Sequence, residues 1–355
     1  MPCIFLIILL IFSTSLHANL GLYAVEESFF YSPSLPSSFA RDRWKSVPSS
    51  GPRTDLFLWS EQGFRWGCGQ FGLLFRSDTI SRHSENFFSF IAATKKKQTL
   101  SNGQRYEIDF ATTHWQGQGL RASCDWRFNQ QSKLVIGLAY LQANYLLQGG
   151  LSGEAQFVSE KDYDFQFSVD YFYSEDHIFA RQVDRPSGRG YALDVLLQTR
   201  LNLDQGYLEL SWQARDIWGA IFWKNTPRTQ AQANSDTKTY DENGYVRFLP
   251  VLSGRETTEN FRQALVSRQK LGLLLNPLKP IGLQAEFFVY QGVIHPSLGF
   301  VRLSPKQRLS LLYLSRSKAL ALAYNNKYLH FSLAMDHFKP RKQHYFAASI
   351  ALKLY

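Results

Sequence analysis

The stretch YDFQFSVDYFY, residues 163–173, alternates apolar and polar side chains along its whole length. An extended strand separates these side chains by face, whereas a helix would mix them. One face carries Tyr163, Phe165, Phe167, Val169, Tyr171 and Tyr173, and the other carries Asp164, Gln166, Ser168 and Asp170. Aromatic and β-branched residues are also those that strands favour. The stretch therefore predicts a β-strand with one apolar face and one hydrated face.

The same period of two recurs through most of the chain. Several of the segments reach about ten residues, which exceeds the usual strand length and matches a tilted strand that spans a membrane. About 16 strands are expected, and 14 is the alternative because residues 153–160 and 318–325 alternate weakly. The expected strands are residues 63–76, 87–94, 105–113, 118–128, 133–146, 153–160, 163–174, 190–203, 206–215, 263–275, 281–291, 297–304, 308–315, 318–325, 328–336 and 344–355.

The connections between these strands sort by length. Counted back from the C-terminus, one side receives mostly short connections, such as Asn129–Ser132, Asp204–Gln205 and Asn276–Pro280. Lys161–Asp162 and the longer Lys95–Gln104 fall on that side too. The other side receives the longest connection, residues 216–262. Outer-membrane barrels sort short periplasmic turns from long outer loops in this way, which favours an even number of strands.

The first 18 residues predict a secretory signal peptide, because an apolar run from Ile4 to Phe12 precedes small residues that end at Ala18. The run is far shorter than the ~20 residues of a spanning helix. Residues 19–62 contain several prolines and many serines, so we expect an irregular N-terminal segment there, followed by the strands of residues 63–355.

The composition excludes several classes of protein. Hydrophobic residues make up 45%, aromatic residues 15% and charged residues 19%, with a mean hydropathy of −0.25. These values argue against both a helical membrane protein and a disordered chain. The net charge of +10 lies largely outside the strands, in Lys95–Lys97 and around Arg341. Those loops either are simply solvated or bind lipopolysaccharide phosphates, and an exported protein is not expected to bind nucleic acid.

The cysteines predict no metal centre. Cys3 belongs to the leader, and no group of Cys and His has the spacing of metal ligands. Cys68 and Cys124 each share a face with apolar neighbours on strands that the pattern does not make adjacent, so we expect both thiols to be unpaired. No cofactor is expected.

With its leader, its alternating strands, its sorted connections and a final aromatic residue, Tyr355, the chain resembles Gram-negative outer-membrane β-barrels of the broad porin-like class. The resemblance implies an all-β, antiparallel transmembrane β-barrel over residues 63–355. It also implies contact with outer-membrane lipid, including lipopolysaccharide, and a homo-oligomeric or periplasmic partner.

Charged residues recur on the polar faces of the expected strands and are candidates for lining a lumen. They are Arg105, Glu107, Asp109, Arg121, Asp125, Arg127, Asp164, Asp170, Asp194, Arg200, Glu209, Arg215 and Glu286. In a wide barrel these groups would make a selective aqueous path, and in a narrow barrel they would form a lattice of ion pairs. Trp218, Phe222 and Trp223 begin the long connection. They either extend the preceding strand above the membrane or, as the favoured alternative, belong to a constriction loop that folds into the lumen.

Three functions stay open at this point. The first is a pore or transport channel for a small solute. The second is a structural component of a secretion or assembly system, which would engage residues 19–62. The third is a lipid or peptide hydrolase that uses His177 or His295, but no histidine has recognisable catalytic partners in the sequence, so a non-enzyme is expected.

Overall fold

The computed structural model of the protein describes residues 20–38, 52–96, 103–159, 162–176, 179–236, 238–240, 246–248, 251–278 and 280–354. One antiparallel sheet of 16 strands contains nearly all of them, and a two-stranded hairpin stands apart. The strands are β1 (Gly21–Tyr31), β2 (Arg53–Trp66), β3 (Gly69–His83), β4 (Arg105–Arg127), β5 (Ser132–Ser159), β6 (Asp162–Tyr173), β7 (Ser187–Asn202), β8 (Tyr207–Asn234), β9 (Lys238–Tyr240), β10 (Val246–Phe248), β11 (Leu252–Ala264), β12 (Arg268–Leu278), β13 (Ile281–Tyr290), β14 (Val293–Leu303), β15 (Gln307–Leu314), β16 (Ala319–Asn326), β17 (Leu329–Met335) and β18 (Tyr345–Leu354).

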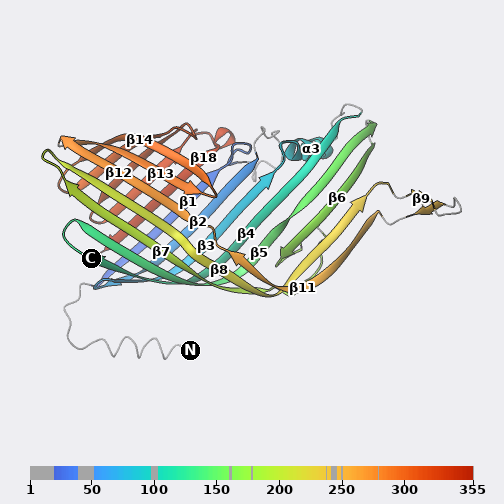
Figure 1. The fold of residues 1–355 in the computed structure, drawn as a ribbon, viewed down its shortest axis with the longest axis horizontal. Helices are drawn as coiled ribbons and strands as arrows, with labels where there is room; N and C mark the ends of the chain where they lie inside the picture. Colours follow the sequence, from blue (N-terminus) through green and yellow to red (C-terminus); the bar gives the residue numbers. More distant parts are fainter. Residues whose placement is uncertain are drawn as a thin grey trace, which may run out of the picture.

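Fourteen of these strands close into a barrel. The order around the ring is β8, β12 to β18, β1 to β5 and β7, and β7 pairs again with β8. β1 and β18 join the two ends of the chain (Figure 1). The predicted antiparallel barrel is confirmed, with 14 strands in the ring.

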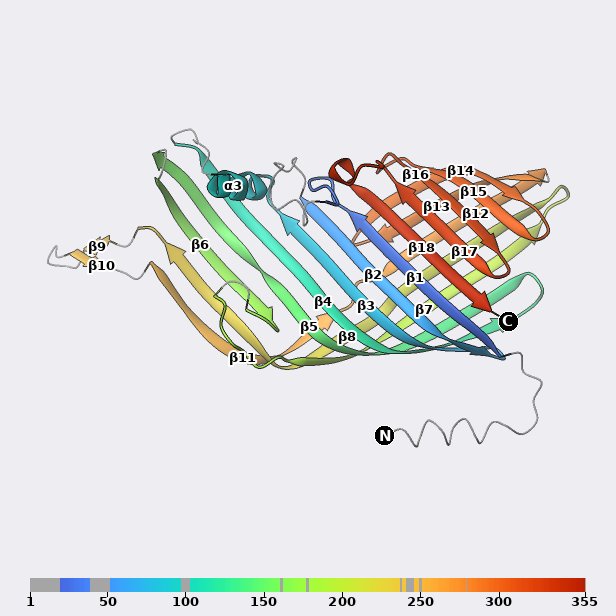
Figure 2. The same cartoon turned by 180° about the vertical axis from the view of Figure 1, so that it is seen from behind.

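β4, β5 and β8 continue past one rim of the ring, and β6 and β11 pair with their extensions. We call this extension the wing; it comprises residues 105–116, 145–159, β6, residues 225–234 and β11. Figures 1 and 2 show it reaching away from the barrel, with the β9–β10 hairpin at its far end. β6 and β7 pair one after the other with the same edge of β5. Leu147 of β5 pairs with Tyr173 of β6, and Ala143 pairs with Gly188 of β7.

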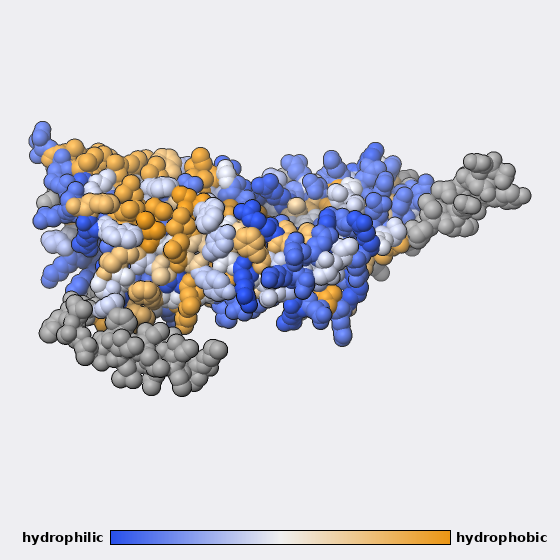
Figure 3. All heavy atoms as spheres, turned by 60° about the horizontal axis from the view of Figure 1, so that its bottom comes forward, coloured by the Kyte–Doolittle hydropathy of each residue, from blue (hydrophilic) through white to orange (hydrophobic). Residues whose placement is uncertain are grey.

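The two faces of the ring differ in chemistry. Large apolar side chains on the outer face are exposed, among them Leu73 at 68%, Leu138 at 61% and Leu298 at 64%. Charged and polar side chains occupy the inner face. Figure 3 shows apolar residues gathered over the barrel and hydrophilic residues over the wing. The ring therefore presents an apolar band to its surroundings.

Helix α3 (Glu85–Lys96) covers the outer face of the wing, where Phe87, Phe88 and Phe90 pack against Tyr106 and Ile108. Phe165 and Phe167 of β6, the strand predicted from residues 163–173, pack against the same cluster, and the rings of Phe90 and Phe167 lie 6.1 Å apart. The predicted strand is confirmed, but a helix covers its apolar face. No helix among the described residues is both long enough and apolar enough to cross a bilayer.

Several expected boundaries differ in the structure. Residues 87–94 belong to α3, because Phe87, Phe88 and Ile91 follow a helical period. Residues 105–113 and 118–128 form the single strand β4, and 133–146 with 153–160 form β5, because glycines such as Gly117 and Gly149 lie within extended strands and do not form turns there.

The barrel also begins earlier than residue 63. β1 and the first part of β2 lie within the segment expected to be irregular, and β1 escapes the alternation because Glu26 and Glu27 are adjacent charges. Because residues 105–113 and 118–127 form one strand, as do 133–146 and 153–159, helix α3 and the end of β5 lie at the rim with the long connections. The expected turn at Lys161–Asp162 falls partly outside the described residues. The expected short turns at Asn129–Ser132, Asp204–Gln205 and Asn276–Pro280 do lie on the opposite rim, with the end of β18.

A disulfide joins Cys68, in the turn between β2 and β3, to Cys124 on β4, with 5.0 Å between their Cα atoms. The expectation of unpaired thiols is therefore corrected. β3 and β4 are neighbours, and their register places Gly69 opposite Cys124, so the turn residue before Gly69 reaches the partner strand.

We predict that unfolding in denaturant without reductant leaves Cys68 and Cys124 closed to alkylation, whereas reduction opens both, as counted by mass spectrometry. The Cys124→Ser variant should lower the free energy of unfolding by about 2–4 kcal/mol, because the cross-link no longer restricts the unfolded chain. Alkylation of both thiols without reductant would contradict the assignment.

Candidate functional site

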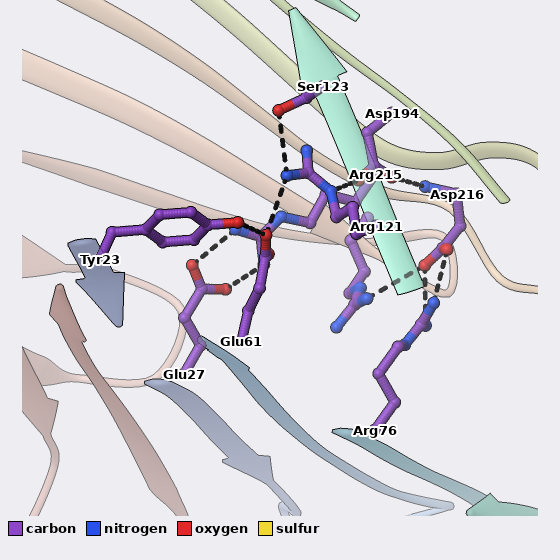
Figure 4. A network of polar contacts seen from close by, with 10 residues as sticks. Tyr23, Glu27, Glu61, Arg76, Arg121, Ser123, Asp194, Arg215 and Asp216 are labelled. Atoms are coloured by element: carbon purple, nitrogen blue, oxygen red, sulfur yellow. Dashed lines mark hydrogen bonds and ion pairs between the residues drawn. The ribbon is translucent and has the colours of Figure 1, made fainter. Parts of the chain in front are cut away.

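The carboxylate of Asp216 lies inside the barrel between two arginines (Figure 4). Arg76 on β3 donates to its two oxygens over 2.7 and 2.9 Å, and Arg268 on β12 donates over 3.0 Å. Arg76 is 0% exposed, Asp216 2% and Arg268 4%. Arg76 also donates to Asp78 Oδ2 over 2.8 Å, and Asp78 is 4% exposed. Charges removed from water to this degree are stable only when they are paired and hydrogen-bonded, so these four residues act as one unit.

A bulge in β8 brings Asp216 to this position. The pairing of β7 with β8 shifts between Leu193 and Val195, and Asp216 has a φ of 53°. Its backbone N–H donates to Asp194 Oδ1 over 3.0 Å. A non-glycine residue in the left-handed region is uncommon, and bulges re-aim a side chain that regular pleating would turn away. The bulge therefore turns a side chain of β8 into the lumen.

A second ion pair joins strands that are not neighbours in the ring. Arg215 on β8 donates to both oxygens of Glu27 on β1, over 2.5 and 2.8 Å. The Arg215 guanidinium also lies over the ring of Trp59, 4.4 Å from its centroid. Arg76 lies between the rings of Trp59 and Trp115, at 5.0 and 4.9 Å. Side chains thus cross the lumen and fill its middle.

We call this set of side chains the partition. It consists of Glu27, Trp59, Arg76, Asp78, Trp115, Arg215, Asp216 and Arg268. A further pair of contacts flanks it, in which Arg121 donates to Asp194 over 2.9 Å and to Glu61 over 3.3 Å.

Beside the partition is an internal cavity of about 390 Å³, which we call the chamber. Phe29, Phe57, Phe288 and Tyr345 form an aromatic part of its lining. The rings of Phe29, Phe288 and Tyr345 pack around His295, and Phe57 stacks on Phe29. The charged side chains of the lining are Glu27, Arg215, Arg268, Lys270, Glu286 and Arg308, so cations outnumber anions. Lys270 pairs with Glu286 over 2.7 Å. The chamber thus combines an aromatic wall with a charged one.

The predicted lumen residues divide into two groups. Eight lie on strands within the ring: Arg121, Asp125, Arg127, Asp194, Arg200, Glu209, Arg215 and Glu286. The other five lie on the wing, away from the ring's lumen: Arg105, Glu107, Asp109, Asp164 and Asp170. Helix α3 covers one face of the wing. The other face, which carries these five side chains, is open to solvent and lies beyond the rim of the ring.

The three constriction candidates do not form a loop, because they continue β8. Trp218 and Phe222 lie on the outer face, where their rings stack near Tyr191 at 5.0 and 5.8 Å. Trp223 lies on the other face, is buried, and donates from Nε1 to Gln263 Oε1 over 2.9 Å. The expectation of an inward-folded loop is corrected: the long connection is built mainly from β8, β9, β10 and β11, which extend the sheet.

Several partition residues were missed from the sequence. Glu27 lies in the segment taken as irregular, and Asp216 was assigned to the long connection. The alternation of β3 could have predicted that Arg76 and Asp78 face inward. They lie on the same face as Leu74, opposite the exposed Leu73 and Phe75. Which side chains meet across the lumen depends on ring closure, which alternation does not reveal.

Ion pairs also hold the wing together. Arg228 on β8 donates to Asp170 on β6 over 2.7 and 2.8 Å, and to Glu259 on β11 over 3.2 Å. The hydrogen bond from Arg228 lowers the pKa of Asp170. Asp170 is therefore ionised at neutral pH, and Arg228 links β6, β8 and β11 outside the ring.

The histidines show no catalytic arrangement in the described part of the chain. His295 is 2% exposed, and neither ring nitrogen has a hydrogen-bond partner. The hydroxyl of Ser297 donates to the carbonyl of Glu286. His177 lies outside the described residues. Among those that are described, no cluster of three or more His, Cys, Asp or Glu side chains could hold a metal ion.

We predict that Asp216→Asn lowers the free energy of unfolding by about 3–5 kcal/mol, because the buried Arg268 loses its counter-charge and the buried Arg76 keeps only Asp78. Urea titration of the protein in lipid bilayers would measure this. The matched control is Glu154→Gln, which breaks an exposed pair with Arg105 and should cost at most about 1 kcal/mol. Equal losses in the two variants would contradict the importance given to burial.

No protein-family model matches the chain, and no curated protein matches it. Solved structures do match over most of both chains. A TodX deltaS2S3 mutant monoaromatic hydrocarbon channel is 9% identical, with a TM-score of 0.41 and coverage of 96% of this chain and 90% of that chain.

The Ralstonia pickettii toluene transporter TbuX is 10% identical, with a TM-score of 0.29 and coverage of 94% and 88%. The Pseudomonas putida toluene transporter TodX is 8% identical, with a TM-score of 0.26 and coverage of 96% and 90%. The closed ring of this chain has the architecture of a porin-like β-barrel.

Proposed function

We propose that the protein is a gated channel for a small solute in the outer membrane of a Gram-negative bacterium. The observation that carries this proposal is the interior of the ring: a chamber of about 390 Å³ adjoins a partition that consists of side chains. Side chains can change rotamer on a timescale far shorter than that on which a folded plug would leave. A barrel closed by side chains can therefore open without unfolding.

The outer surface supports the membrane location. Exposed leucines and aromatic residues lie on the outer face of successive ring strands, such as Leu138 on β5, Leu298 on β14 and Leu311 on β15. A closed barrel satisfies the backbone hydrogen bonds of every ring strand, as the hydrocarbon region of a bilayer requires. The predicted signal peptide agrees with export to that membrane.

The ion pair between Arg215 and Glu27 is the candidate gate within the partition. Its side chains are 15% and 25% exposed, whereas Arg76 and Asp216 have no exposed side-chain surface. A partly hydrated pair costs less to separate than a fully buried one. The channel would therefore open by parting Arg215 from Glu27 while the Arg76–Asp216 pair stays in place.

We predict that the purified protein in planar bilayers shows low conductance with brief openings, and that the Glu27→Ala/Arg215→Ala variant raises the mean conductance at least about twofold by clearing the crossing. The control variant is Arg105→Ala/Glu154→Ala, which removes an ion pair on the wing and should leave conductance unchanged.

Inserted barrels that show neither conductance nor solute flux, in the parent protein and in the opened variant, would refute the channel. The structural role in a secretion or assembly system would then gain support. Hydrolysis of lipid or peptide that is lost in His295→Ala would instead favour the enzyme.

We predict that Leu298→Arg, in the middle of β14 on the outer face, destabilises the protein in bilayers by about 2–4 kcal/mol, because the guanidinium enters hydrocarbon. Leu252→Arg is the matched control, since Leu252 is 51% exposed but lies on the wing. The shift between folded and unfolded bands on unboiled gels measures both. Equal tolerance of the two substitutions would show that the apolar outer face of the ring does not lie in the bilayer.

A further inference from the structure

The two faces of the wing are unequally covered. On the outer face, Ala155, Phe157, Phe165 and Phe167 pack beneath α3 and are buried or half-buried. On the inner face, Ser152, Gln166, Ser168 and Gln232 are exposed. This inner face encloses an open cavity of about 860 Å³, which we call the trough. The trough is larger than the chamber and has no role in the proposed channel.

The register of the wing arranges the polar side chains of the trough in two rows across its strands. One row runs Glu107, Glu154, Gln166 and Asn234, and the other runs Ser152, Ser168 and Gln232. Residues opposite each other on adjacent strands are ~5 Å apart, and residues two apart along a strand are ~7 Å apart. The trough therefore carries a regular grid of polar groups.

The side chains in the middle of the grid have no partner within the described part of the chain. Gln166, Ser168 and Gln232 make no side-chain hydrogen bond to another described residue. Nearer the ring on the same two strands, Asp170, Arg228 and Gln230 are joined by several hydrogen bonds. The part of this face nearer the ring thus stabilises the wing. The middle of the grid, farther from the ring, makes no such hydrogen bonds between described side chains, so its amides and hydroxyls are available to a ligand.

The chemistry of the trough selects a class of ligand. Amides and hydroxyls both donate and accept hydrogen bonds, which suits a ligand that carries many hydroxyl groups. Glu107 and Glu154 disfavour an anion, and Arg105 is already paired with Glu154. An apolar solute finds little to bury against, because few large apolar side chains line the cavity. Of the common ligand classes, a neutral saccharide fits these groups best.

The trough also lies beside the entrance to the ring. β4, β5 and β8 each run without interruption from the ring into the wing, so the polar inner face of the wing continues the inner wall of the barrel. We propose that the trough binds a neutral oligosaccharide from the medium at the outer rim of the barrel. This site is separate from the partition and does not depend on the channel being correct.

Isothermal titration of the full-length protein in detergent with neutral gluco-, manno- and galacto-configured hexasaccharides tests the proposal. We expect at least one of them to bind with a Kd below about 1 mM, a weak affinity typical of few net contacts. Gln166→Ala/Gln232→Ala should weaken binding about tenfold or more, because two hydrogen-bonding side chains are lost. Gln116→Ala, on the outer face of β4, should bind as the parent does.

Gel mobility of the unboiled variants shows whether each one folds, and bilayer conductance of the double variant should equal that of the parent. No binding of any hexasaccharide, or equal binding by the double variant, would overturn the proposal. Preference for an acidic hexasaccharide, or binding only to vesicles of smooth lipopolysaccharide, would also overturn it, because the ligand would then be an anion or a lipid-linked glycan.

Discussion

The interior of this barrel depends on the carboxylate of Asp216, which is shared by two buried arginines. Arg76 and Arg268 reach Asp216 from β3 and β12, Arg76 also pairs with Asp78, and none of these side chains has appreciable contact with solvent. Without Asp216, Arg268 would lose its counter-charge and Arg76 would keep only Asp78, and movement of either guanidinium would disturb Trp59, which lies against both. The position of Asp216 depends in turn on the bulge in β8. A local irregularity of one strand therefore fixes contacts among three.

Most of the fold follows from side-chain alternation. Period-two patterns locate the ring strands β7, β8 and β12 to β18, and the lengths of the connections give the even count and the rim that carries the short turns. The expected strand 63–76 was wrong, because the turn between β2 and β3 lies within it. The failures have physical causes. Glycines within β4 and β5 look like turns in a sequence, although they are extended and paired in the sheet, and the adjacent charges Glu26 and Glu27 hide β1.

Alternation also says that a face is apolar without saying what covers it. For Phe167 the cover is a helix, for Leu138 it is the surroundings of the barrel, and for Trp223 it is the interior. The same limit applies to the site. Arg215 was predicted to face inward from its strand alone, but its partner Glu27 comes from β1, whose proximity only ring closure creates. Glu286 was also predicted to face inward, and its partner Lys270 lies on the adjacent strand β12. The disulfide was missed for a related reason, because it depends on which strands are neighbours.

The closing seam of the ring has a consequence for how the chain reaches this state. Leu22 pairs with Leu354, so the last contact of the wall joins the two extremes of the sequence. Contacts this remote are costly in chain entropy and form late. Until β18 arrives, β1 and β17 both remain open edges that can pair with another chain. The incomplete barrel is therefore exposed to aggregation until its last strand is made and paired.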